Sequence, residues 1–118
     1  MNIFIKFKAY LQLREAVKKA DEAHEEDGER YYVLPTNDGK LIVMDRKNFR
    51  ILKKKHYINR NSNIRDLVEE CFYCTPYRDG SMFLTEKAIE MKRQQFYSWK
   101  EAYRKMNKAR KHPDNKKG

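Results

Sequence analysis

The chain has 118 residues, of which 40% are hydrophobic and 13% aromatic, so it suits one domain with a modest core and is too apolar for a disordered chain. Its 27 lysines and arginines exceed its 17 acidic residues, and the formal net charge of +10 predicts attraction to polyanions or acidic protein surfaces. No run approaches the roughly 18 apolar residues of a membrane helix, and Lys6 and Lys8 interrupt the N-terminal apolar run. We therefore expect a cytoplasmic protein without a signal peptide or a membrane partner.

A helix is predicted over residues 6–26, because apolar positions recur there at spacings of three and four. Gly28 suits its C-terminal cap, whereas residues 1–5 are compatible with either a helical extension or an edge strand. Acidic residues near the end oppose the helix dipole, so we expect a basic group close to them. The predicted apolar face comprises Phe7, Tyr10, Leu13, Val17, Ala20 and His24, with Ala9, Ala16 and Ala23 beside it.

The stretch "RYYVLPTNDGKLIVMD" predicts a β-hairpin, with Asp38 and Gly39 in the turn between two apolar runs. Pro35 lacks a backbone donor, so the first strand either leaves the pairing there or lies at a sheet edge. An isolated hairpin is only marginally stable in water, which favours a third strand. We expect that strand in "CFYCTPY", residues 71–77.

Three further helices are predicted. Asp45 suits the N-cap of a helix over residues 46–57, and a shorter helix follows over residues 63–70. Thr85 opens the longest helix, over residues 85–111, and Pro113 ends it. The last of these helices should pack through Ile89, Phe96, Trp99, Tyr103 and Met106.

The expected fold is therefore a single small α+β domain over residues 1–111, with a flexible basic tail over residues 112–118. It consists of an N-terminal helix, a β-hairpin that a third strand extends, two short helices and a long amphipathic C-terminal helix.

Two rows of basic side chains are predicted on helix surfaces. Like charges at spacings of four repel by a few tenths of a kcal/mol per pair, so an anion lying along them would remove a systematic penalty. A solvated charged face is the alternative interpretation of both rows. The first row is Arg46, Arg50 and Lys54 with Lys47 beside it, and the second is Arg93, Lys100, Arg104, Lys108 and Lys111.

These rows predict a non-catalytic protein that contacts a nucleic-acid backbone, or another polyanion, without reading sequence. No recognised nucleic-acid motif is present, so base-specific contacts are not expected. The alternative function is a virion or assembly subunit that binds neighbouring proteins through complementary acidic and basic faces. In that case the acidic residues Asp21, Glu22, Glu25 and Glu26 would form the protein-interaction surface, and the chain would form a homo-oligomer or a larger assembly.

The pair Cys71 and Cys74 could supply half a zinc site, with His56 and His112 as further ligands. However, zinc knuckles place glycine near the second cysteine, and a redox site requires an exposed thiolate at a helix start. We therefore expect the cysteines to pack as small apolar residues, with no metal and no cofactor. No phosphate loop, nucleophile elbow or zinc-protease motif occurs, so we expect neither catalytic residues nor enzyme activity.

The stretch "RYYVLPTNDGKLIVMDRKNFRILKKKHYI", followed by "ECFYCTPYRDG", resembles short uncharacterised basic proteins of Bacteroidetes genomes and their phages. The resemblance covers about residues 30–80, and the shared element is a hairpin followed by a basic helix. It implies a component of a phage particle or mobile element, in which small basic subunits contact nucleic acid or decorate an assembly. It carries over no functional residue.

Overall fold

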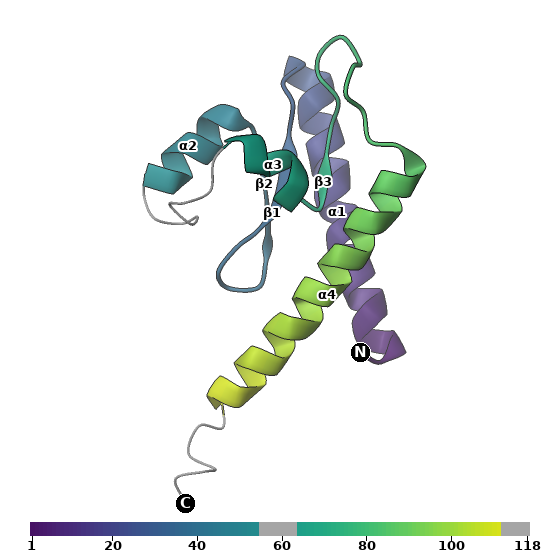
Figure 1. Cartoon of the computed structure of the whole chain (residues 1–118), viewed down its shortest axis with the longest axis vertical. Helices are drawn as coiled ribbons and strands as arrows, with labels where there is room; N and C mark the ends of the chain where they lie inside the picture. The colour runs from purple at the N-terminus through teal and green to yellow at the C-terminus, as the bar shows by residue number, and fades with distance from the viewer. Residues whose placement is uncertain (55–63, 112–118) are drawn as a thin grey trace, which may run out of the picture.

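A computed structural model describes residues 1–54 and 64–111 of the chain. It has the mixed α+β architecture that the sequence predicts (Figure 1). The predicted tail, and the part of the predicted basic helix beyond residue 54, lie outside the described residues. The elements are α1 (Ile3–Asp27), β1 (Tyr32–Pro35), β2 (Leu41–Met44), α2 (Arg46–Lys54), α3 (Ile64–Glu70), β3 (Tyr73–Cys74) and α4 (Glu86–Lys111).

The strands form one antiparallel sheet in the order β2-β1-β3, so the predicted third strand is confirmed. Because β1 is central, the alternative that placed it at a sheet edge is wrong. The other alternative, that the strand leaves the pairing at Pro35, is confirmed. Strand β3 pairs with β1 only at Tyr32 and Val33, and Pro35 is the last residue of β1. The missing N–H of Pro35 therefore interrupts no pairing with β3.

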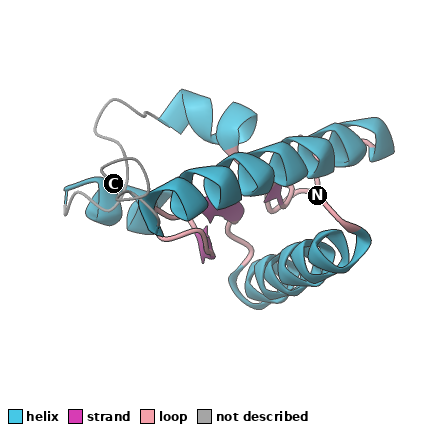
Figure 2. Cartoon of the chain, turned by 90° about the horizontal axis from the view of Figure 1, so that it is seen from below, coloured by secondary structure: helices cyan, strands magenta, loops and turns pink. Residues whose placement is uncertain are grey.

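Apolar side chains alternate along the hairpin and supply a separate core on each face of the sheet. Val33, Leu41 and Val43 belong to the core that α1 and α4 cover. Figure 2 shows the strands lying among the helices. The opposite face meets α2 and α3 through a second cluster, consisting of Tyr32, Leu34, Met44, Phe49, Leu67, Cys71 and Cys74.

Residues 3–5 extend α1, which is the helical alternative left open for the N-terminus. Asn2 caps the helix, since the Ile5 N–H donates to the Asn2 side chain at 2.9 Å. It ends at Gly28, whose φ of 77° and N–H bond to the His24 carbonyl at 2.7 Å form the expected C-cap. The buried face is narrower than predicted, since Phe7 is 57% exposed. The fully covered positions are Ala9, Leu13, Ala16 and Ala20, mostly small residues that allow close approach to the sheet.

Helix α4 begins after Thr85, whose side chain accepts from the Ala88 N–H at 3.1 Å, as predicted. It packs through Phe96, which is fully buried against Phe72. The predicted packing is wrong at the ends, where Ile89 and Met106 are 38% and 49% exposed. A 26-residue helix extends about 39 Å, whereas a four-residue strand extends only about 13 Å. The sheet is therefore too short to cover both ends of the helix.

The tip of the hairpin rests on α4. Gly39 has a φ of 81°, and a Cβ added there would lie 2.4 Å from the Tyr103 ring. The Lys100 ammonium donates to the Gly39 carbonyl at 2.9 Å. Glycine is required here both for the left-handed backbone and for the close approach of the ring.

Replacing Gly39 with alanine should therefore destabilise the fold more than the same change at Gly80. Gly80 has a similar φ of 82° but no neighbour within 4 Å of an added Cβ. Gly80→Ala should cost about 1–2 kcal/mol for the backbone alone, and Gly39→Ala about 1–3 kcal/mol more for overpacking. Urea unfolding of both variants measures the difference, and equal losses would show that the hairpin tip does not depend on this contact.

Candidate polyanion interface

Helix α2 presents a basic face because its opposite side is fixed to the core. Asp45 caps the helix as predicted, since its side chain accepts from the Asn48 N–H at 2.9 Å. Phe49 is only 2% exposed and packs with the core on the α2 side of the sheet. Burying this ring stabilises the fold by about 1.5–3 kcal/mol and fixes the rotation of the helix. The four basic side chains left exposed are Arg46, Lys47, Arg50 and Lys54.

These α2 cations have no carboxylate partner within the described part of the chain. The ion pairs found there join the N-terminus to Glu101, Arg78 to Glu29, Arg93 to Glu90 and Arg104 to Glu101. None of them involves α2. The predicted crowding of like charges is therefore present on this helix without internal compensation among residues 1–54 and 64–111.

Some of the basic side chains in the predicted row on α4 already bind other groups of the same chain. Arg93 pairs with Glu90, and Arg104 lies 3.4 Å from the Glu101 carboxylate. Lys100 donates to the Gly39 carbonyl, and its partial burial lowers the pKa of its ammonium group. Lys108 is exposed, whereas the Lys111 side chain lies outside the described residues. The anion-binding role of this row stays a prediction.

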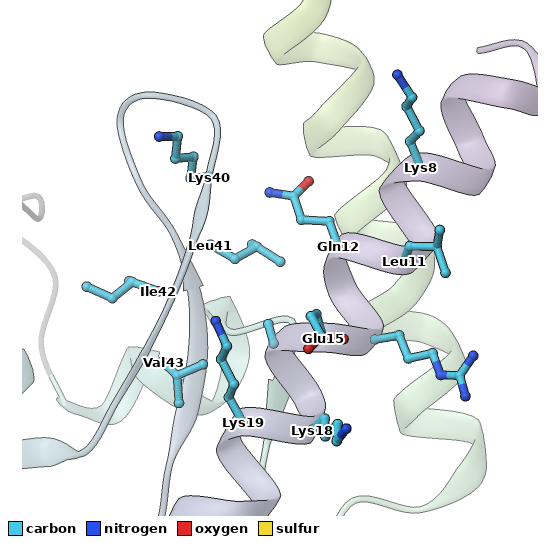
Figure 3. A pocket seen from close by; sticks show the side chains of 12 residues that line it. Lys8, Leu11, Gln12, Glu15, Lys18, Lys19, Lys40, Leu41, Ile42 and Val43 are labelled. Carbon is cyan, nitrogen blue, oxygen red and sulfur yellow. The ribbon is translucent and has the colours of Figure 1, made fainter.

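A third basic surface, which the sequence analysis missed, lines a groove of about 910 Å³ between α1 and β2 (Figure 3). Nearby acidic residues hide it in the sequence. Residues 1–20 contain five basic side chains and one acidic, but the six acidic side chains of residues 21–30 offset them. A helical projection of residues 3–20 alone would have grouped most of these cations. The charged residues lining the groove are Lys8, Arg14, Glu15, Lys18, Lys19 and Lys40.

The predicted acidic surface lies at the C-terminal end of α1. Glu22, Glu25 and Glu26 are exposed, whereas Asp21 accepts a hydrogen bond from the Tyr73 hydroxyl at 2.7 Å. The basic group expected near this end is Arg78. It donates to the Asp27 carbonyl at 2.7 Å and lies 3.6 Å from the Glu29 carboxylate.

The cysteines are both buried, and Arg30 lies beside Cys74. The Arg30 guanidinium donates to the Cys74 sulfur at 3.3 Å, to the Thr75 carbonyl at 2.8 Å and to the Met82 carbonyl at 2.9 Å. Arg30 is itself buried, so its charge favours a thiolate on Cys74 in this interior.

A second buried cation, Lys92, lies beside the same cysteine pair. Its ammonium donates to the Cys71 carbonyl at 2.9 Å and to the Val68 carbonyl. Both carbonyls belong to the end of α3 or follow it directly, where a cation is favoured by the helix dipole. Lys92 therefore connects α4 to the C-terminal end of α3.

The described residues do not form a complete zinc site. Among them, no group of three His, Cys, Asp or Glu side chains lies close enough to hold a metal ion. His56 and His112, the further ligands that the sequence suggested, lie outside the described residues. The buried cations next to the sulfurs would also oppose a divalent metal ion.

The chain matches no family model, no curated protein and no solved structure. None of the described helices combines the length and apolar character that crossing a membrane requires.

The cysteine environment predicts a pH-dependent stability. The neighbouring Cys71 thiol, together with the charge of Arg30, lowers the pKa of Cys74 to about 6. The pKa of a cysteine in an unfolded chain is about 8.5. Between these values the unfolded chain binds more protons than the folded one, so stability should rise with pH and be lost as the pH falls through 6.

Urea unfolding of the reduced protein and of Cys74→Ala, from pH 6 upward, measures this contribution. The variant should lose the rise with pH. Val33→Ala also opens a cavity in the core but removes no thiol, so it should keep the rise. Parallel pH profiles for the Cys74→Ala variant and the unsubstituted protein would contradict a lowered pKa at Cys74.

Proposed function

We propose that this protein is a non-catalytic binding protein whose α2 face holds a nucleic-acid backbone by electrostatic contacts. The observation that carries the proposal is the set of four exposed α2 cations with no ion-pair partner among the described residues. Binding would release the counterions condensed on the phosphates and relieve the repulsion between neighbouring cations.

The contacts proposed here carry no sequence information. Lysine and arginine bonds to phosphate position a protein on a nucleic acid but do not distinguish bases. Base stacking at this site would require an exposed aromatic ring beside the α2 cations, and the aromatic residue of α2, Phe49, is buried. We therefore propose backbone binding without sequence readout, in the cytoplasm or in a phage particle of the kind that the resemblance implies.

A virion or assembly subunit is the second candidate function. It is favoured by the separation of charge along α1, where Lys8, Lys18 and Lys19 are exposed before residue 20 and Glu22, Glu25 and Glu26 are exposed after it. Such a helix suits contacts with acidic and basic surfaces of neighbouring proteins. This function ranks second because Asp21, one of its four predicted residues, already bonds to Tyr73.

The salt dependence of binding tests the leading proposal. The Arg50→Gln/Lys54→Gln variant should bind a short labelled DNA or RNA more weakly, and the slope of log K against log salt should fall by about 2. Fluorescence anisotropy titrations at several salt concentrations measure both quantities.

The matched control is Lys87→Gln/Lys105→Gln, which removes the same charge from exposed positions outside both predicted rows. It should leave the slope almost unchanged. A flat salt response of the unmodified protein, or equal losses in the two variants, would exclude backbone binding through α2.

A further inference from the structure

Strand β2 is an edge strand whose outer side has no strand partner in the described chain. The Thr36 N–H donates to the Lys40 carbonyl, and the Phe72 N–H donates to the Val33 carbonyl. By the alternation of an antiparallel ladder, the backbone groups of Ile42 and Met44 point toward β1. The N–H and C=O groups of Leu41 and Val43 therefore point outward and could pair with another strand.

The groove between α1 and β2 lies directly beside this edge. Leu41 and Val43 line it from the strand, and Leu11 and Ala16 line it from the helix. Figure 3 shows Leu41 pointing from β2 toward α1, while Ile42 points away. A strand added to β2 would thus have an apolar surface of α1 beside one of its faces.

The charged lining of the groove indicates the chemistry of its occupant. The charged side chains that line the groove are five cations, Lys8, Arg14, Lys18, Lys19 and Lys40, and one carboxylate, Glu15. All five cations are exposed, and none forms an ion pair with a residue of the described ranges. An acidic ligand is therefore complementary to the groove, and a basic one would be repelled.

Two other occupants fit less well. A second copy that paired through its own β2 would bring two Lys40 side chains and two sets of α1 lysines toward each other. A second copy could not offer its acidic segment 21–27 as a strand either, because that segment is helical. A nucleic-acid backbone could meet the lysines through its phosphates, but it has no alternating N–H and C=O groups to pair with the edge of β2.

We propose that the groove binds an extended acidic segment of a partner protein, which adds as a fourth strand beside β2. Its backbone pairs with the outward groups of Leu41 and Val43, and its carboxylates meet the lysines of α1 and Lys40. Main-chain bonds supply affinity in this mode of recognition, and the flanking side chains supply specificity. The proposal concerns a different surface from the α2 face and does not depend on nucleic-acid binding.

The test uses a fluorescent peptide of alternating glutamate and valine, with fluorescence anisotropy as the readout. The full chain should bind it with an affinity that falls as salt is added. The same peptide with methylated central backbone nitrogens keeps its charge but lacks the donors. It should bind about tenfold more weakly, since about two hydrogen bonds are lost.

Variants of the protein locate the site. Val43→Pro removes an N–H that points away from β1, and proline is tolerated on edge strands. Because one hydrogen bond is lost, it should lower peptide affinity several-fold, and Lys18→Gln/Lys19→Gln should also lower it several-fold. The Lys87→Gln/Lys105→Gln variant removes the same charge elsewhere and should bind normally. Circular dichroism of each variant checks its fold.

Four outcomes would overturn the proposal. The first is that the acidic peptide does not bind. The second and third are that the methylated peptide, or a peptide with lysine in place of glutamate, binds as tightly as the acidic peptide. The fourth is that sedimentation shows a dimer of the unmodified chain that Val43→Pro dissociates. The methylated peptide is tested against the unmodified protein, so this comparison stands even where Val43→Pro fails to fold.

Discussion

The need to bury both faces of a very short sheet determines this structure. The strands contain four, four and two residues, so neither face offers enough apolar area to form a core by itself. Helices must therefore cover both sides. Each helix gives its apolar side to the sheet, through the alanines of α1, Phe49 of α2 and Phe96 of α4. The charged side of each helix is left facing outward, which is why the basic excess appears as separate helix faces.

Some of the positive charge is used inside the fold, and it joins the ends of short elements. Arg30 connects the start of β1 to β3 and to the loop before α4, through the carbonyls of Thr75 and Met82. Its guanidinium also lies 4.5 Å from the centre of the Tyr77 ring. Lys92 binds the carbonyls at the end of α3, and Lys100 binds the tip of the hairpin. The α2 cations differ from these three because each is exposed.

The sequence predicted features that depend on a few neighbouring residues. Asp38 and Gly39 indicated the turn, and Asp45 and Thr85 indicated two helix starts, because turns and caps depend on local hydrogen bonds. The third strand was predictable because an isolated hairpin is only marginally stable in water. The ends of the α4 contact were mispredicted, since periodicity gives the direction of a face but not the length of the surface that it meets.

The candidate sites were predictable only in part. The exposed face of α2 followed from helical periodicity. The contacts of Lys100 with Gly39 and of Arg30 with Cys74 join residues far apart in sequence, so no local pattern indicates them. The groove between α1 and β2 requires an edge strand to lie beside a particular helix face. Such a placement is a property of the tertiary structure.

Amide NMR of the isotope-labelled chain, titrated with a short nucleic-acid duplex at moderate salt, tests the central claim most directly. The largest chemical-shift changes should fall within α2, at Arg46–Lys54, and the acidic end of α1 should show none. Changes concentrated on other elements, or an unchanged spectrum at saturating duplex, would contradict an α2 face that binds the nucleic-acid backbone.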